Sequence, residues 1–545
     1  MGIGATAGVA AIGGITLSGQ ASATTTASSA SSSSPGSLVF DPDAYTEITT
    51  TITGADLKDH EVTYHFWKAI TYVAKPVDEE YQSLIVSVPV EIDGTAVDAS
   101  NAPIVVSNVI AGYMPSSVTT ATGVGGAAMT GTPPAGGPGG ASASPSASAS
   151  ASASPSATPT ASASASATPE PGGGGAAAMP KMALLAGYVV VEPGARGRSL
   201  TNTAGEYYGT APAAIVDLKA AVRYIRSNKG RIPGNTDRII SAGVSAGGAL
   251  SALVGSSGDS PLYATYLKEI GAADTSDAVF ASADWCPIAD LEHADGAYEW
   301  NWGTNVTQTT GAVVDQTVSK QLQAQFAEYQ ASLKLRGMDG FGPLTARNYD
   351  DYLLDTFIRP SATAYLKALS DTDRATYLAA NTDIGWDGEQ ATFTWAQYLA
   401  HVGARKKTTP AFDAFDLSAG ENNEFGTGTT LARHFTAYGA KNDTTGLATK
   451  RVASDIPAKL RLMNPMHFIV DQPNSRRAKH WWIRLGTNDT DTALTVSANL
   501  ATALDNLGDD VNYLFYWDQG HGANIDLGDF VTWIADISGH KSRRK

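Results

Sequence analysis

The pattern of apolar and polar positions predicts a chain of strands and helices that belong to one sheet. Near the N-terminal end, short runs rich in β-branched and aromatic residues predict strands at residues 62–66, 70–74, 82–88 and 102–107. After these, a strand at 187–192 precedes residues 213–225, whose apolar positions recur at helical spacing. The same alternation continues with strands at 278–284, 480–485 and 511–516 and helices at 494–507 and 530–536. Such alternation is typical of an open α/β sheet covered by helices.

The strand–helix rhythm stops between Cys286 and about Arg477. Helical patterns occur there instead, and Leu322, Phe326 and Leu333 fall on one face of one of them. A connection of this length cannot be a bare loop in a compact domain. Residues 286–477 are therefore predicted to form a mainly helical lid domain, inserted into the sheet before its last strands.

A second insertion has low complexity. Residues 134–175 consist mainly of Ala, Ser, Pro and Gly, a composition that buries too little apolar surface to offset chain entropy. Because strands of one sheet are predicted on both sides, we interpret the tract, at about 120–178, as a disordered insertion within a domain. The predicted core then comprises residues 39–285 and 478–545.

The N-terminal end and the charge indicate an exported protein. Residues 1–23 are small and apolar and end in Ala21-Ser-Ala23, which predicts a signal peptide, and residues 24–38 predict a disordered linker. No later stretch is apolar over the length of a membrane helix. The net charge of −16 argues against a nucleic-acid partner. We therefore expect a secreted protein, with association to a cell surface as an option, and no membrane partner.

The strongest chemical signal is Gly243-Val-Ser245-Ala-Gly247. It lies between an apolar strand and a helix-like run, and this strand–turn–helix context is the nucleophile elbow of the α/β-hydrolase fold. Glycines on both sides of the serine allow the sharp turn that exposes its hydroxyl group. The alternative is a solvent-facing serine in an ordinary turn.

An acid and a histidine follow the serine in the order that this fold requires. Asp489 lies just after the strand 480–485, and His521 lies just after the strand 511–516. Both loops would reach the sheet edge that carries Ser245. The expected roles are Ser245 as nucleophile, His521 as general base and acid, and Asp489 as the group that orients the imidazole.

The oxyanion of an acyl-transfer reaction needs two fixed N–H donors. We expect one from Ala246, directly after the nucleophile. The second is assigned to Gly112, in the loop after the strand 102–107, with an ordinary turn glycine as the alternative. Cys286 is the only cysteine, which excludes an intramolecular disulfide, and its surroundings suggest a small apolar role.

Several motifs in order resemble the bacterial tannases, the tannin acyl hydrolases of the α/β-hydrolase superfamily. The resemblance covers roughly residues 64–536. It rests on Asn108-Val-Ile-Ala-Gly-Tyr-Met114, Pro193-Gly-Ala-Arg-Gly-Arg198, Gly243–Ala249, Cys286-Pro-Ile-Ala-Asp-Leu-Glu-His-Ala-Asp295, Pro410-Ala-Phe-Asp413, Glu421-Asn422 with Phe425-Gly426, and Gly486–Asp491.

The resemblance implies a galloyl-binding set of Lys407, Glu421 and Asp491, with Ile288 as an apolar wall. Carboxylates accept hydrogen bonds from phenolic hydroxyls, and an ammonium group donates to a phenol oxygen. Alternatives stay open: Lys407 as part of a solvated basic run, Glu424 in place of Glu421, Asp491 as a helix cap, and Ile288 as a core residue.

Some positions depart from the family pattern. Val244 and Gly520 precede Ser245 and His521, so the cysteine pair of fungal tannases and feruloyl esterases is absent. Gly420 precedes Glu421 where closer relatives are expected to have proline. These departures concern substrate preference more than hydrolase chemistry.

The resulting hypothesis is a secreted serine esterase that hydrolyses galloyl and related hydroxybenzoyl esters through an acyl-enzyme. It requires no metal or organic cofactor, and its partner is a small phenolic ester. One rival is a feruloyl or general carboxylesterase on the same scaffold. The other is a catalytically silent binding protein for polyphenols or cell-wall glycans.

Overall fold

A computed structural model describes residues 36–131 and 178–540 of the chain. The predicted signal peptide and most of the Ala/Ser/Pro/Gly tract lie outside the described residues. The predicted disordered insertion, at about 120–178, begins too early in the chain. Residues 120–131 are described and include the short strand β7 (Ala128–Met129), because the backbone N–H groups of Gly125 and Ala127 donate to the buried Glu192 carboxylate.

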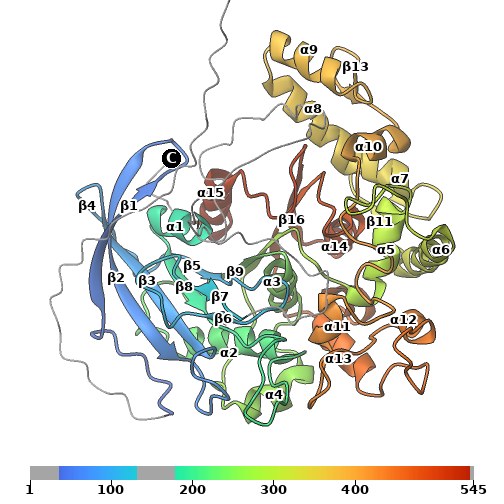
Figure 1. Cartoon of the computed structure of the whole chain (residues 1–545). Helices are drawn as coiled ribbons and strands as arrows, with labels where there is room; N and C mark the ends of the chain where they lie inside the picture. Colours follow the sequence, from blue (N-terminus) through green and yellow to red (C-terminus); the bar gives the residue numbers. More distant parts are fainter. Residues whose placement is uncertain (1–35, 132–177, 541–545) are drawn as a thin grey trace, which may run out of the picture.

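The core is a twisted sheet that is antiparallel at one end and parallel from its middle to the other end (Figure 1). Its main path runs β1-β2-β3-β8-β5-β9-β10-β15-β16, and the pairings from β8 to β16 are parallel. The strands on this path are β1 (Thr46–Thr53), β2 (Asp59–Thr71), β3 (Ser83–Ile92), β8 (Val189–Pro193), β5 (Ile104–Ser107), β9 (Ile239–Val244), β10 (Ala281–Trp285), β15 (His480–Gly486) and β16 (Asp510–Tyr516). Short strands flank them at β4 (Thr95–Ala96) and β6 (Ser116–Ser117). The predicted α/β-hydrolase sheet is confirmed.

Helices cover both faces of the sheet (Figure 1). On one side α1 and α15 contact each other, and on the other α2 contacts α3 and α4. The core helices are α1 (Ala178–Leu185), α2 (Ala213–Ser227), α3 (Ala246–Ser256), η1 (Pro261–Tyr263), α4 (Ala264–Glu269), α14 (Leu494–Asn506) and α15 (Leu527–Ser538). The central strands β5, β8 and β10 are buried at every position, as expected for parallel strands covered on both faces.

The segment between β10 and β15 is mainly helical, and we call it the lid. It contains α5 (Leu291–Trp302), α6 (Gln316–Leu333), α7 (Tyr349–Leu353), η2 (Leu354–Ile358), α8 (Arg359–Ala368), α9 (Asp371–Ala380), α10 (Trp395–Val402), α11 (Gly420–Glu424), α12 (Ala437–Lys441), α13 (Ile456–Met463) and η3 (His467–Asp471). Two small hairpins, β11 (Arg336–Gly337) with β12 (Gly342–Pro343) and β13 (Gly385–Trp386) with β14 (Ala391–Thr392), join them. Helix α5 packs on α6 and also on the core helix α14, which fixes the start of the lid to the sheet.

Two predicted strands at 62–66 and 70–74 prove to be one. Strand β2 continues from Asp59 to Thr71, with a register shift against β3 between Trp67 and Ile70. Ala69 within this shift has a φ of 54°, so an added residue bulges out and the strand continues. Strand β1 and helix α1 were not predicted from the sequence pattern.

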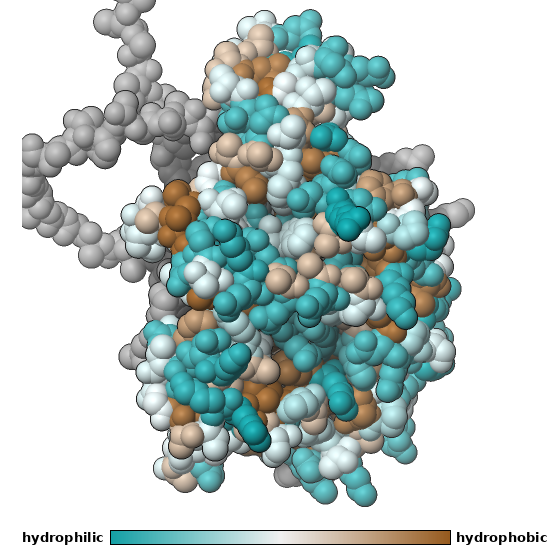
Figure 2. All heavy atoms as spheres, turned by 90° about the vertical axis from the view of Figure 1, so that its right-hand side faces the viewer, coloured by the Kyte–Doolittle hydropathy of each residue, from teal (hydrophilic) through white to brown (hydrophobic). Residues whose placement is uncertain are grey.

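The surface on the side of the lid is mostly polar. Figure 2 shows that the side of the molecule bearing the lid is mostly hydrophilic, with apolar residues in small separate patches. Exposed large apolar side chains of the lid are few, and two of them, Val306 and Val313, lie opposite each other in an isolated β-bridge. In the described part of the chain, no helix combines the length and the apolar character needed to cross a bilayer.

Candidate active site

Ser245 lies on a strained turn between β9 and α3. Its φ of 63° and ψ of −124° are backbone angles that an L residue rarely adopts. The two flanking glycines make this turn sterically possible. A Cβ on Gly243 would lie 2.3 Å from the carbonyl oxygen of Gly247, and a Cβ on Gly247 would lie 2.4 Å from Oδ1 of Asn108. The sequence motif therefore has the steric reason that was predicted for it.

Asn108 supports the elbow from the end of β5. Its Nδ2 donates to the carbonyl oxygens of Ala242 and Gly247, each at 3.1 Å, and to the Ser251 hydroxyl at 3.2 Å. The side chain is buried, and its amide group links the end of β9 to the start of α3. The sequence contained this residue in a family motif, but nothing in the pattern showed this supporting contact.

The structure brings the three residues of the predicted triad together. His521 Nε2 lies 2.8 Å from Ser245 Oγ, and His521 Nδ1 lies 2.8 Å from Asp489 Oδ2. The Asp489 side chain is fully buried, whereas the imidazole keeps 16% of its surface exposed. This geometry allows the imidazole to take a proton from the hydroxyl group while the carboxylate stabilises the resulting positive charge.

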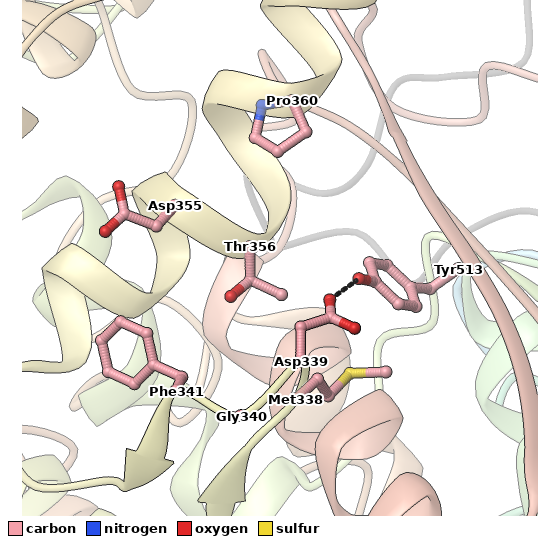
Figure 3. A pocket seen from close by; sticks show the side chains of 8 residues that line it. All are labelled: Met338, Asp339, Gly340, Phe341, Asp355, Thr356, Pro360 and Tyr513. Atoms are coloured by element: carbon pink, nitrogen blue, oxygen red, sulfur yellow. Dashed lines mark hydrogen bonds between the residues drawn. The ribbon is translucent and has the colours of Figure 1, made fainter.

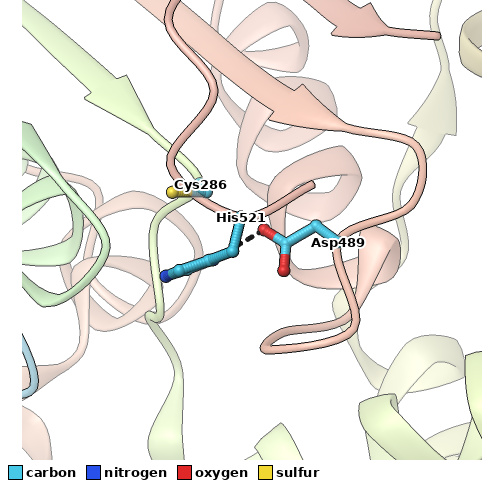
Figure 4. Close-up of side chains that lie close together, drawn as sticks. All are labelled: Cys286, Asp489 and His521. Carbon is cyan, nitrogen blue, oxygen red and sulfur yellow. Dashed lines mark hydrogen bonds and ion pairs between the residues drawn. The ribbon is translucent and has the colours of Figure 1, made fainter. Parts of the chain in front are cut away.

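Cys286 lies against the same imidazole (Figure 4). Its thiol is buried, and its backbone has a φ of 38°. Burial lowers the pKa of His521, but the neighbouring Cys286 and Asp489, which are negative when deprotonated, together outweigh burial and raise it above the ordinary value of 6.5. The surroundings therefore favour the imidazolium form that exists after proton transfer from the serine.

Two backbone N–H groups near Ser245 lack partners among the described residues, namely those of Ala246 and Gly112. Ala246 begins helix α3, where the first N–H groups point out of the helix. Gly112 lies in an exposed turn closed by a 3.0 Å bond from the N–H of Met114 to the carbonyl of Ala111. The turn contains two successive residues with positive φ, 55° at Gly112 and 56° at Tyr113. Both expected oxyanion donors are thus unpaired.

The lid contributes two neighbouring ion pairs. Lys407 Nζ lies 3.4 Å from Glu421 Oε1, and Lys406 Nζ lies 2.7 Å from Asp491 Oδ1. The Lys407 ammonium also lies 3.7 Å from the centre of the Phe412 ring, within cation–π range. The side chains of both pairs are only partly exposed. The structure therefore links each of the three predicted polar binding residues to a charged partner, and Lys406 is a member that the sequence did not single out.

Asp489 and Asp491 bind different groups. Asp489 binds His521, and Asp491 binds the lid lysine. The backbone N–H of Asp491 donates to Asp489 Oδ1 at 2.9 Å, which fixes the loop between them. Asp491 does not cap the next helix, because α14 begins at Leu494 and has no side-chain cap bond.

Comparisons with known proteins identify the family. A family model described as BD-FAE matches residues 175–331. A tannase from Fusobacterium nucleatum is 33% identical with a TM-score of 0.72, covering 92% of this chain and 99% of that chain. The native tannin acyl hydrolase from Lactobacillus plantarum is 31% identical with a TM-score of 0.72, over the same shares. The comparison with curated proteins found no match.

This chain belongs to the tannase family. Its enzyme class is carboxylic ester hydrolase, on an α/β-hydrolase fold.

In this tannase-family chain, Arg198 connects the turn at Gly112 to the lid. Its Nε donates to the carbonyl of Gly112 at 2.7 Å, and its Nη1 donates to Oδ1 of Asn423 in α11 at 2.8 Å. The backbone of Gly420 passes close by, since an added Cβ there would lie 2.9 Å from Arg198 Nη2. Burial lowers the pKa of Arg198, while the nearby Glu421 carboxylate raises it. The position where proline was expected is therefore a glycine packed against a buried arginine.

The basic run before Lys407 is not uniformly solvated, as one alternative assumed. Arg405 is fully buried and paired with the equally buried Glu299 of α5, with Nη1 at 2.8 Å from Oε2. Its Nε and Nη2 donate to the carbonyls of Lys407 and Thr408 at 2.8 and 2.9 Å. One guanidinium thereby fixes the backbone next to Lys406 and Lys407.

The remaining candidates occupy different surroundings. Ile288 is 7% exposed, its N–H donates to the carbonyl of Ser245 at 3.3 Å, and its carbonyl accepts from Tyr113 Oη at 2.9 Å. Glu424, the rival to Glu421, is 1% exposed, and neither carboxyl oxygen has a partner in the described chain. Burial raises the pKa of Glu424 well above its ordinary value, which favours the neutral form of the carboxyl group.

A separate cavity of about 410 Å³ opens beside the edge strand β16 (Figure 3). Asp339 and Phe341 line it from the β11–β12 hairpin, Pro360 from α8, and Tyr513 from β16, and the Tyr513 hydroxyl donates to Asp339 at 3.2 Å. None of the candidate site residues lines this cavity.

Proposed function

We propose that this protein hydrolyses esters of gallic acid and related hydroxybenzoic acids through an acyl-enzyme formed on Ser245. The observation that carries the proposal is the hydrogen-bonded series from Asp489 through His521 to Ser245, with two ion pairs of the lid nearby. A tannin acyl hydrolase that is 31% identical to this chain has been solved in complex with ethyl gallate, which supports the substrate class.

The reaction proceeds in two halves. His521 takes the hydroxyl proton of Ser245 while Oγ attacks the ester carbonyl, and the N–H groups of Ala246 and Gly112 stabilise the oxyanion. The carbon–oxygen bond to the alcohol then breaks, and His521 returns its proton to the leaving alkoxide. Water, activated by the same imidazole, attacks the acyl-enzyme and releases the acid.

The lid provides selectivity for the phenol ring. The carboxylates of Glu421 and Asp491 accept hydrogen bonds from ring hydroxyls, and the Lys407 ammonium donates one. Ile288 offers an apolar contact beside the serine. A site built to pair hydroxyl groups rejects an analogue without them, because its buried polar groups then stay unpaired.

We also propose that the enzyme acts outside the cell on a small soluble ester. The apolar segment at residues 1–23 supports export, and the net charge of −16 speaks against nucleic acid as a partner. Secretion is tested by whether the expressed full chain accumulates in the medium and whether its N-terminal residues are removed there.

The decisive test compares methyl gallate, methyl benzoate and methyl ferulate. We expect the highest kcat/KM on the gallate and the lowest on the benzoate. Lys407→Ala and Glu421→Ala should raise KM for the gallate with little change for the benzoate, and Ser245→Ala should abolish turnover. Equal kcat/KM on the three esters contradicts the proposed pocket, and highest activity on the ferulate favours a feruloyl esterase.

A further inference from the structure

The thiol of Cys286 forms a compact cluster with two members of the triad. One donor atom each of Cys286, Asp489 and His521 lies within 4.8 Å of the other two (Figure 4). Cys286 is 2% exposed and is the only cysteine of the chain. Its N–H donates to the carbonyl of Arg484 at 2.7 Å, so the backbone of the adjacent strand holds the thiol in place.

The three donors match the preferences of a soft divalent ion. Zinc is commonly bound by thiolate, imidazole and carboxylate, with three protein ligands and one open position. At bond lengths of about 2.0–2.3 Å, two ligands of a tetrahedral ion lie roughly 3.5 Å apart. Donor atoms within 4.8 Å therefore need shifts of only about 1 Å to bind one ion.

We propose that Cys286, His521 and Asp489 form an inhibitory site for soft divalent ions such as Zn²⁺ and Cd²⁺. The ion binds the thiolate of Cys286, which releases its proton to solvent, together with one imidazole nitrogen and one carboxylate oxygen. The protein then keeps its fold and loses the base that the reaction needs.

The ion inhibits the reaction regardless of which imidazole nitrogen of His521 it binds. An ion on Nε2 of His521 occupies the lone pair that accepts the proton of Ser245. An ion on Nδ1 replaces the proton donated to Asp489, and the neutral ring then carries its proton on Nε2, which can no longer accept one. In both cases the hydroxyl group stays protonated and unreactive. This consequence for activity rests on the proposed serine chemistry, whereas metal binding itself does not.

The contribution of the thiol can be isolated because no second cysteine exists in the chain. Cys286→Ser replaces the thiol with a hydroxyl group at the same position and removes the soft ligand. Rates of methyl gallate hydrolysis are measured against ZnCl₂ in a non-chelating buffer, each normalised to the metal-free rate of the same variant. We expect at least a tenfold higher half-inhibitory Zn²⁺ concentration for Cys286→Ser, recovery on addition of EDTA, and no inhibition by Mg²⁺. Equal Zn²⁺ sensitivity in both proteins overturns the proposal.

A second measurement does not depend on turnover. Cd²⁺ is titrated into the full-length Ser245→Ala protein and into Ser245→Ala/Cys286→Ser, and the thiolate-to-cadmium absorption in the ultraviolet is followed. We expect one Cd²⁺ per chain with this absorption in the first protein and none in the second. Absence of the absorption from the first protein overturns the metal site. If the absorption is present and the protein with Ser245 intact hydrolyses no methyl gallate, the metal site stands and only the proposed function is rejected.

Discussion

Replacing Arg405 with methionine tests whether the buried ion pair between Arg405 and Glu299 sets the position of the neighbouring Lys407. Arg405 and Glu299 are both fully buried, and the guanidinium also donates to the carbonyls of Trp302, Lys407 and Thr408. Methionine matches the apolar stem of arginine but cannot neutralise the carboxylate or bind the carbonyls. The change therefore leaves an unpaired buried charge and frees the backbone before the acyl pocket.

The expected cost can be estimated from the burial of the pair. Removing one partner of a buried ion pair costs about 3–5 kcal/mol, because the other charge remains unpaired in the interior. Replacing both partners with apolar residues of similar size is often neutral in stability. We therefore expect Arg405→Met to be destabilised by about 3–5 kcal/mol and Glu299→Leu/Arg405→Met to recover most of this loss.

Two assays separate stability from positioning. Urea unfolding followed by tryptophan fluorescence gives the free energy of unfolding for the wild type, the single variant and the double variant. The KM for methyl gallate should be raised in both variants, because neither retains the bonds to the carbonyls of Lys407 and Thr408. A single variant as stable as the wild type, or a double variant with the wild-type KM, refutes this reasoning.

Three further predictions concern the two aspartates after β15, the elbow glycine and the buried Glu192. Asp489→Asn should lower kcat by about 10⁴ because the triad histidine loses its orienting carboxylate, whereas Asp491→Asn should mainly raise KM for methyl gallate. Steady-state kinetics of the two variants test this prediction. The same change in kcat and KM in both variants contradicts separate roles for the two aspartates. Gly243→Ala places a Cβ 2.3 Å from a backbone oxygen of the elbow and should lower both Tm and activity. Gly520→Ala is the control and should leave Tm unchanged, because its added Cβ meets nothing within 4 Å. Thermal unfolding of the two variants distinguishes these outcomes. Burial raises the pKa of Glu192 from 4.5 to about 7. Between these pH values the native state binds more protons than the unfolded state, so the contribution of Glu192 to stability is lost as pH rises through that window. Glu192→Gln should therefore reduce the difference in urea midpoint between about pH 4 and about pH 8, and an unchanged difference speaks against the shift.

Features governed by local sequence were predictable. The elbow at Ser245 could be recognised because the strand, the two glycines and the helix are adjacent in the chain. Asp489 and His521 could be assigned because parallel strands end at one edge of the sheet, so residues directly after those strands must meet there. The break in the strand–helix rhythm and the length of the connection placed the lid between β10 and β15 without any knowledge of its internal structure.

Features governed by tertiary packing were not predictable. Arg405, Lys406 and Lys407 are consecutive basic residues with nothing in their sequence to distinguish them. The structure gives them three different acidic partners, Glu299, Asp491 and Glu421, that lie before and after them in the chain. Which carboxylate meets which cation depends on how the lid helices pack on the sheet, and hydrophobic periodicity contains no information on that pairing.

The contacts of Arg198 show how the lid and the chemistry of the serine are joined. The arginine is buried, and its two hydrogen bonds reach the carbonyl of Gly112 on one side and Asn423 of α11 on the other. Because Glu421 lies in the same short helix as Asn423, a shift of that helix must move either the arginine or the turn that presents the Gly112 N–H. The proposed acyl pocket and the proposed oxyanion donor are therefore parts of one hydrogen-bonded unit. Selectivity for the acid and stabilisation of the oxyanion then depend on the same buried guanidinium.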